Sequence, residues 1–393
     1  MGHDVWVLTR ANNRASIERE LGQRTPLPSL HFLFYDLPGW LRRWKSGRRG
    51  LYVYYVLWQW GAYRLAKREH RQVGFDLVHH VTLVSIRFPS FMGGLEIPFI
   101  FGPVGGGETA PLRLRRGYGS KGFLRDAFRD LANWFVRIDP LVRSTLRRAT
   151  RIYVTSEQTR ALVPRVFRHK TALRLAIGYD GGPTPAPGAT RQYEGLSLLY
   201  VGEFLYLKGM HLGLRAFSLL LTTCPNARLT LIGKGSAEKE WKRLASELGI
   251  QERLIWIPWL SRQELLRQYQ QYDIFLFPSL RDSGGFVLLE SLSAGLPVVC
   301  FNLGGPGTIV DETCGRVIGV ETGNRDTIVK RLADELRRLS MNEELRNRLS
   351  VGARERARHF EWQRHIDTLY ETADADIRKT QVLRQLTVGR DRS

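Results

Sequence analysis

Residues 277–302 read FPSLRDSGGFVLLESLSAGLPVVCFN, and this stretch decides the fold. The apolar run 273–277 stops at Pro278, which is typical of a buried strand in a parallel sheet. A tight loop follows, then a short helix expected over 287–294 and a second strand over 297–301. The order of strand, glycine loop, helix and strand predicts a Rossmann-like unit.

The loop before this helix has the composition of an anion site. Gly284 and Gly285 allow the backbone to turn its N–H groups towards a ligand, where the N-terminus of a helix adds positive potential. This geometry suits a phosphate group. Two carboxylates, Asp282 and Glu290, stand eight positions apart on either side of the loop.

These residues resemble a known signature. An acidic residue and a Glu eight positions later are followed by Gly-x-Pro-Val-Val at 295–299 and by Gly304-Gly305. In this pattern the chain resembles the retaining, GT-B-fold glycosyltransferases of family 4, the bacterial glycosyltransferase group 1. That family usually has Glu at the first acidic position, where this chain has Asp282.

The resemblance, together with strand–helix alternation in both halves, implies an α/β GT-B fold with two Rossmann-like domains facing across a cleft. We expect an N-terminal acceptor-side domain over 1–180, a C-terminal nucleotide-sugar donor domain over 181–375 and a tail over 376–393. A Gly/Pro-rich linker at 178–188 marks the boundary. In the family, the sequence that corresponds to residues 2–9 normally forms the second strand. We therefore expect an N-terminally truncated first domain that lacks its first strand.

The resemblance also implies the chemistry: transfer of a sugar, of the hexosyltransferase type, with retention of the anomeric configuration. Lys208 and the loop amides would hold the leaving diphosphate, and Asp282 would hold sugar hydroxyls or stabilise positive charge at the anomeric carbon. Glu290 would hold the ribose diol, although a helix N-terminal carboxylate also complements the helix dipole. The candidate donor-binding residues are Lys208, Gly202, Gly233, Lys234, Ile257, Pro258, Ser283, Gly284, Gly285 and Phe286.

No metal or other cofactor is expected, because the nucleotide-sugar is a substrate. The single Asp-x-Asp, at 374–376, is expected on the solvent face of the last helix. Glu203 departs from the family, which has Arg at this position. A carboxylate pointing into the site would oppose a diphosphate, unless it turns outward or another cation substitutes.

Candidate acceptor-side residues follow the strands of the first domain. The run 75–82 is expected to be a strand carrying His79 and His80, and strand ends are where open α/β sheets bind ligands. We take His80 as a catalytic candidate and His79 as an acceptor contact, with a purely structural role as the alternative. Many family members carry a sugar-contacting His near residue 102, where this chain has Gly-Pro. The glycine loop behind it supplies the remaining candidates, Gly105, Gly106 and Glu108; the alternative is a permissive loop with no ligand.

Charge separates the two halves of the chain. The net charge is +21; residues 1–180 hold 30 Lys+Arg and 13 Asp+Glu, against 29 and 25 in residues 181–393. The first half is therefore expected to meet something anionic. Residues 41–71 combine basic clusters with an aromatic centre, which fits an interfacial helix on an anionic membrane or, equally, a core helix with a basic rim.

Residues 112–151 are rich in Arg, with aromatic residues at helical spacing. This pattern predicts amphipathic helices with a cationic, solvated face. A nucleic-acid binder would also be basic, but no recognised nucleic-acid motif accompanies the charge. We therefore expect no nucleic-acid partner.

The sequence thus predicts a glycosyltransferase that uses a nucleotide-sugar donor and a glycan or lipid-linked acceptor in bacterial exopolysaccharide or cell-surface glycan assembly. No apolar run approaches about 18 residues, and the three cysteines lack disulfide or metal spacing. We expect a cytoplasmic protein, peripheral at the inner face of the plasma membrane. The alternative is a catalytically weak or inactive homologue that still binds nucleotide-sugar or membrane.

Overall fold

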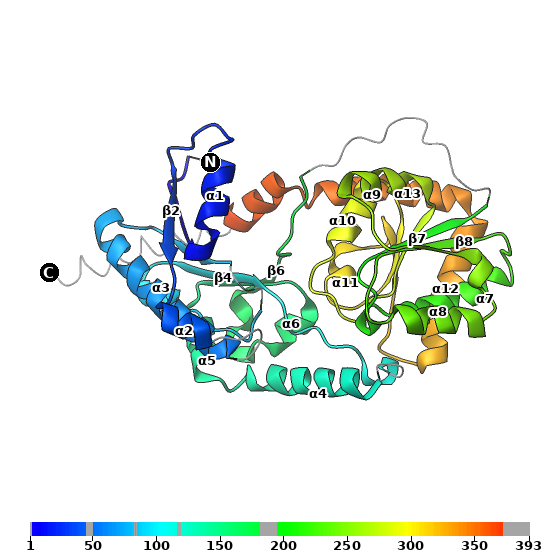
Figure 1. Cartoon of the computed structure of the whole chain (residues 1–393), viewed down its shortest axis with the longest axis horizontal. Helices are drawn as coiled ribbons and strands as arrows, with labels where there is room; N and C mark the ends of the chain where they lie inside the picture. Colours follow the sequence, from blue (N-terminus) through cyan, green and yellow to red (C-terminus); the bar gives the residue numbers. More distant parts are fainter. Residues whose placement is uncertain are drawn as a thin grey trace.

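The structure is a computed structural model that describes residues 2–44, 50–81, 83, 85–115, 119–180 and 195–371. It places two α/β domains side by side (Figure 1). Every pairing between its named strands is parallel, as βαβ connections require. The expected α/β architecture of two Rossmann-like domains is confirmed.

The C-terminal domain is built on one six-stranded sheet in the order β12-β11-β10-β7-β8-β9. Its strands are β7 Ser197–Val201, β8 Arg228–Ile232, β9 Leu254–Ile257, β10 Ile274–Phe277, β11 Val298–Phe301 and β12 Gly315–Ile318. Its helices are α7 Met210–Leu221, α8 Glu238–Glu247, α9 Arg262–Gln268, α10 Phe286–Ser293, α11 Pro306–Ile309, α12 Arg325–Met341 and α13 Glu343–Arg358. Helices cover both faces of the sheet (Figure 1), so its central strands are apolar on both sides.

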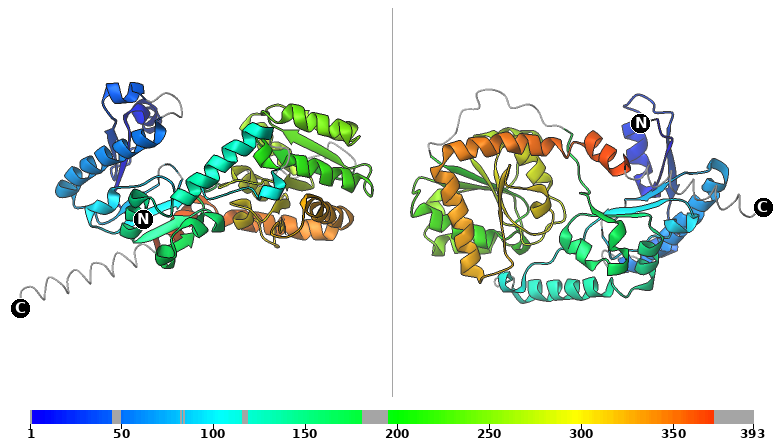
Figure 2. Two further views of the ribbon diagram at one scale, coloured as in Figure 1. Left: turned by 90° about the horizontal axis from the view of Figure 1, so that it is seen from below. Right: turned by 180° about the vertical axis from the view of Figure 1, so that it is seen from behind.

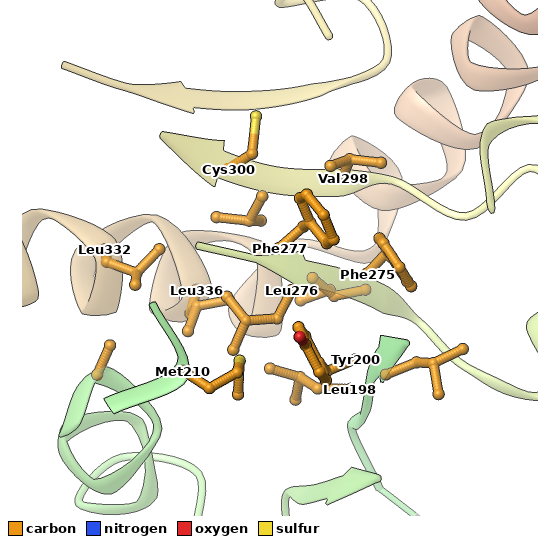
Figure 3. Close-up of a cluster of buried hydrophobic side chains, with 14 of the residues drawn as sticks. Leu198, Tyr200, Met210, Phe275, Leu276, Phe277, Val298, Cys300, Leu332 and Leu336 are labelled. Carbon is orange, nitrogen blue, oxygen red and sulfur yellow. The ribbon is translucent and has the colours of Figure 1, made fainter. Parts of the chain in front are cut away.

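The core of this domain explains that pattern. All residues of β7, β10 and β11 are buried, and they interdigitate with apolar side chains from the covering helices (Figure 3). Leu276 on β10 is fully buried, as are Leu332 and Leu336 on α12. The short apolar runs of the sequence therefore form strands because helices shield both of their faces.

The first domain is divided. One sheet pairs β1 (Val5–Arg10) with β2 (Leu30–Tyr35), and a second sheet has the order β3-β4-β5-β6. Its strands are β3 Val78–His80, β4 Phe99–Val104, β5 Arg151–Val154 and β6 Thr171–Leu173. Within the described residues, no pairing joins β1 or β2 to the four-stranded sheet. No residue of these two strands is fully buried.

Six helices accompany these strands: α1 Arg14–Leu21, α2 Gly39–Trp44, α3 Leu51–Val73, α4 Gly119–Phe135, α5 Pro140–Arg148 and α6 Glu157–Leu162. Helix α3 packs in the core on one side. Tyr54, Tyr55 and Trp58 are buried, and Tyr54 and Trp58 pack in the core of the first domain with strand β4. Tyr52 and Trp60 on the same helix are exposed, so the interfacial interpretation stays a prediction. Residues 45–49 lie outside the described residues.

Three of the described segments that bridge the two domains position them most directly. A helix over residues 362–371 returns to the first domain (Figure 2), where the Tyr153 hydroxyl donates to the Leu369 carbonyl at 2.9 Å. The last described helix therefore crosses from the C-terminal domain to the first domain. The backbone of Tyr179 pairs with the chain around residues 360–362. The third segment, the short 3-10 helix Leu112–Leu114, places Leu114 in the core of the C-terminal domain.

Several finer expectations differ from the structure. Strand β4 runs on through Gly102 and Pro103 to Val104, beyond the strand expected over 97–101, because its residues pack in the buried interior. Strand β2 and helix α1 were not predicted. The linker residues 181–188, the Asp-x-Asp and the tail 376–393 lie outside the described residues.

Candidate functional site

The candidate site lies at the carboxyl ends of β7 and β10, which are neighbours in the sheet. The chain leaves β7 towards β8 and leaves β10 towards β11, in opposite directions across the sheet. Such a topological switch point opens a crevice between the two loops. The loop after β7 carries Lys208, and the loop after β10 carries Asp282.

The structure brings Lys208 and Asp282 into contact. The Lys208 Nζ donates to the Asp282 Oδ2 at 2.5 Å, and both side chains are about four-fifths buried. The two loops are fastened together, since the Leu280 amide donates to the Leu207 carbonyl at 2.9 Å. Gly209 has a φ of +69°, and a Cβ there would lie 1.9 Å from the Pro278 carbonyl oxygen. Only glycine allows this approach.

The Gly304-Gly305 pair packs against the loop that carries Asp282. The Gly305 amide donates to the Asp282 carbonyl at 2.8 Å. A Cβ at Gly304, whose φ is +59°, would lie 2.1 Å from the same oxygen. The Asp282 carboxylate also accepts from the Gly284 amide at 3.3 Å. The motif residues therefore form one packed unit.

Helix α10 joins this loop to Glu290. Gly285, with a φ of +144°, is its N-cap, and the first N–H groups of any helix lack intrahelical partners. Glu290 lies one turn and a half further along and is only 6% exposed. Its carboxylate accepts from the Tyr269 hydroxyl at 3.2 Å and pairs with Arg262 at 3.5 Å. Burial raises the pKa of Glu290, while Arg262 and Tyr269 oppose the rise.

The other predicted donor residues follow the same edge of the sheet. A Cβ at Gly233 would lie 2.0 Å from the Gly202 carbonyl oxygen, so the loops after β7 and β8 touch. The Gly233 amide donates to the Ile257 carbonyl at 2.8 Å, which ties in the end of β9. Lys234, Pro258 and Phe286 are exposed along this edge. The structure thus gathers the predicted residues on four neighbouring loops.

The glycine loop of the first domain faces the acidic loop. A Cβ at Gly105 would lie 2.9 Å from the Ser283 Cβ, and one at Gly304 would lie 3.1 Å from the Glu108 Cγ. Glu108 is 1% exposed and accepts from the Gly106 amide and the Ser156 hydroxyl, each at 2.8 Å. Its carboxylate therefore shapes the loop. Ser156 also caps α6, as expected.

The two histidines are held by other partners. His80 is buried, with its Nε2 3.1 Å from the Tyr55 hydroxyl and its ring against Phe101. The His79 ring lies between the Gly102 carbonyl and the Tyr370 hydroxyl, at 2.5 Å and 2.7 Å, and burial lowers its pKa. Neither ring contacts the Lys208–Asp282 pair in the described structure. Their roles with an acceptor stay predictions.

A cluster of arginines beside the cleft was not predicted. Arg87 and Arg129 both donate to the Gly106 carbonyl, at 2.7 Å and 3.0 Å, and Arg281 pairs with Asp126 of the first domain. Burial, followed by the neighbouring Arg87 and Arg281, lowers the pKa of Arg129 to about 10. The three arginines come from three separate segments of the chain, so no local spacing could have revealed them.

Glu203 and the possible metal ligands bear on the predicted chemistry. Glu203 is exposed, and its carbonyl accepts from the Tyr200 hydroxyl at 3.2 Å. The charge reversal therefore lies towards solvent in this structure. Over the described ranges, no group of three His, Cys, Asp or Glu side chains is placed to hold a metal ion.

Comparison with known structures defines the fold. A glycosyltransferase from Rickettsia africae aligns over 96% of this chain and 91% of its own, with a TM-score of 0.60 at 12% identity. An Anabaena protein, HepE, solved in complex with UDP, aligns over 92% of this chain and 89% of its own, with a TM-score of 0.55 at 14% identity. The chain has the GT-B fold.

Sequence comparison adds the family of the C-terminal part. Residues 191–356 match the family model described as glycosyl transferases group 1. A D-inositol 3-phosphate glycosyltransferase from Saccharomonospora viridis is 31% identical over 293 residues, or 70% of this chain. The alignment spans 62% of that relative's length. Residues 191–356 are thus a glycosyl transferases group 1 domain, and they contain the Lys208–Asp282 pair.

Proposed function

We propose that this protein is a retaining glycosyltransferase that moves a sugar from a nucleotide-sugar onto a glycan or lipid-linked acceptor. The observation that carries the proposal is the contact between Lys208 and Asp282 beside the N-terminus of α10. A cation, a carboxylate and open backbone amides converge at the switch point of a Rossmann-like sheet. The glycosyl transferases group 1 match and the UDP complex of HepE support the same function.

In this proposal each group stabilises charge that develops during transfer. The amides of Gly285 and Phe286 donate to the leaving diphosphate, as does Lys208, whose ammonium has three N–H donors and can also keep Asp282. Asp282 faces the anomeric carbon, where positive charge grows. Glu290 accepts from the ribose hydroxyls, in competition with Arg262. None of these steps requires a metal ion, and we expect none.

We propose that the protein acts at the cytoplasmic face of a bacterial plasma membrane, in exopolysaccharide or cell-surface glycan assembly, with no nucleic-acid partner. The described part of the chain has no helix that is long and apolar enough to cross a bilayer. The relatives named as inositol phosphate glycosyltransferases suggest a phosphorylated inositol as a second acceptor to test.

The test is nucleotide binding and sugar transfer with a panel of nucleotide-sugars. Lys208→Met should weaken UDP binding about 10- to 100-fold, because a charge-assisted hydrogen bond contributes about 1.5–3 kcal/mol. Lys239→Met, an exposed lysine on α8, is the matched control. Unchanged UDP affinity in Lys208→Met would remove this residue from the diphosphate site. Proton NMR of the product gives its anomeric configuration, and an inverted product would contradict retention.

A second experiment separates an active enzyme from an inactive homologue. Because Glu203 is exposed, Glu203→Arg should leave donor affinity within about twofold of the wild type. A large gain would show that Glu203 weakens the site, which favours the catalytically weak alternative. Nucleotide binding without hydrolysis or transfer of any donor would establish that alternative.

A further inference from the structure

Helix α4 presents its apolar side outward. It lies on the underside of the molecule, running from beside the C-terminal domain to the first domain (Figure 1 and Figure 2, left). Five large apolar residues on one side of it are each at least half exposed: Phe123 51%, Leu124 59%, Phe128 65%, Leu131 52% and Trp134 52%. We call them the α4 apolar face. Ile138, just beyond the helix, continues it at 53% exposed.

The inward side of α4 is polar. Asp126, Arg129, Asp130 and Asn133 recur at helical spacing and point towards the protein. Asp126 pairs with Arg281, and Asp130 accepts from Arg115 at 2.7 Å. Arg129 donates to the Gly106 carbonyl at 3.0 Å, and Asn133 accepts from Arg87 at 2.6 Å.

These bonds fix the rotation of the helix. Turning α4 to bury its apolar face would break four polar contacts, two of them ion pairs, and the pair of Arg281 with Asp126 has little access to water. The outward apolar face is therefore built into the fold. A contiguous apolar surface that is held in this way marks an interaction site.

The charges around the face indicate what it meets. Arg125, Arg137 and Arg143 are exposed beside it. The three carboxylates of this region are already engaged, Asp126 and Asp130 by arginines and Asp139 as the N-cap of α5. The surface thus combines apolar side chains with unopposed arginines. A second copy of the chain would bring these arginines against one another, whereas an anionic bilayer would attract them.

We propose that the α4 apolar face docks in the plane of an anionic lipid bilayer, with its aromatic and leucine side chains among the acyl chains and the arginines at the headgroups. This proposal does not depend on glycosyltransferase activity. It places the membrane contact on α4, whereas Tyr54, Tyr55 and Trp58 of the aromatic stretch 41–71 are buried.

Helix α4 and its flanking segments contact both domains. The segment before it inserts Leu114 into the C-terminal domain, Asp126 is paired with Arg281 of that domain, and Val136 at its end lies in the core of the first domain. A bilayer that holds α4 therefore contacts a helix bonded to both domains.

The full chain would be tested by co-sedimentation with vesicles of phosphatidylglycerol and phosphatidylcholine, and with vesicles of phosphatidylcholine alone. We expect binding to the first only, weakened by salt. Phe128→Ser with Leu131→Ser should lower the partition coefficient at least about tenfold. The matched control is Met341→Ser with Val351→Ser, which removes two apolar side chains exposed on α12 and α13. Circular dichroism and melting verify that both variants fold.

Equal binding by the two double variants, or no binding by the wild type, would overturn the proposal. So would a dimer in sedimentation velocity that is lost in Phe128→Ser/Leu131→Ser, since a second copy would then cover the face. Transfer activity on a water-soluble acceptor should be the same in both variants. Loss of vesicle binding with activity kept is a result that the proposed function alone does not produce.

Discussion

The parallel sheets of the two domains differ in how deeply they are buried and in whether they are continuous. In the C-terminal domain every residue of β7, β10 and β11 is buried, whereas no residue of β1 or β2 is. The six-stranded sheet is continuous, while the strands of the first domain fall into a pair and a group of four. The C-terminal domain thus has the continuous sheet, and the half of the chain that carries most of the positive charge has the divided one.

The comparison predicts unequal costs for the same truncation. Leu276→Ala on β10 should lower the free energy of unfolding by about 4 kcal/mol, because a fully buried leucine leaves a cavity in a rigid core. Leu33→Ala on the half-buried β2 should cost about 1 kcal/mol. Urea unfolding, with hydrogen exchange to locate the change, measures both. Equal losses would mean that the divided sheet is as tightly packed as the continuous one.

The first domain also contributes a side chain to the core of the C-terminal domain. Leu114 is fully buried in the C-terminal cluster, so Leu114→Ala should destabilise the C-terminal domain by about 3 kcal/mol. Leu112→Ala, in the same turn but 68% exposed, is the control and should change stability by less than about 0.5 kcal/mol. If hydrogen exchange rises only in the first domain, Leu114 does not join the two units.

The smallest effect concerns pH. Burial lowers the pKa of His211, at the start of α7, to about 4. A depressed histidine pKa means that the unfolded chain takes up the proton first. Its stabilising effect is complete above about pH 6.5 and is lost as the pH falls towards 4. Between pH 7 and pH 5 this group should cost about 2 kcal/mol.

His211→Gln is the comparison for that loss. The variant should show a shallower fall in unfolding free energy between pH 7 and pH 5, measured by urea titration at each pH. The buried His79 and His365, whose pKa values burial also lowers, remain in both proteins. A wild type and a variant with parallel pH profiles would show that His211 is not responsible.

The sequence predicted the C-terminal half well because its signals are local. The strand β10, the loop around Asp282 and the helix carrying Glu290 are consecutive in the sequence. The family resemblance assigned Lys208 and Asp282 to one site, and the neighbouring strands β7 and β10 bring the two side chains into contact.

What the sequence did not reveal depends on distant partners. The periodicity of α4 shows that it has two faces, but which face turns inward is decided by Arg87, Arg115 and Arg281. The burial of Leu114 in the other domain has the same cause. The sequence of the short turn Leu112–Leu114 does not indicate which hydrophobic core Leu114 joins.

The returning helix 362–371 has a practical consequence for chimeras. Tyr153 and His79 of the first domain bond to Leu369 and Tyr370, so these late residues are structurally part of the early half. A hybrid that takes everything after residue 180 from a relative would replace this helix with one that evolved to pack on a different first domain. Keeping residues 362–371 with the first domain, and making the second junction near Phe360, keeps the contacts of this helix with the first domain.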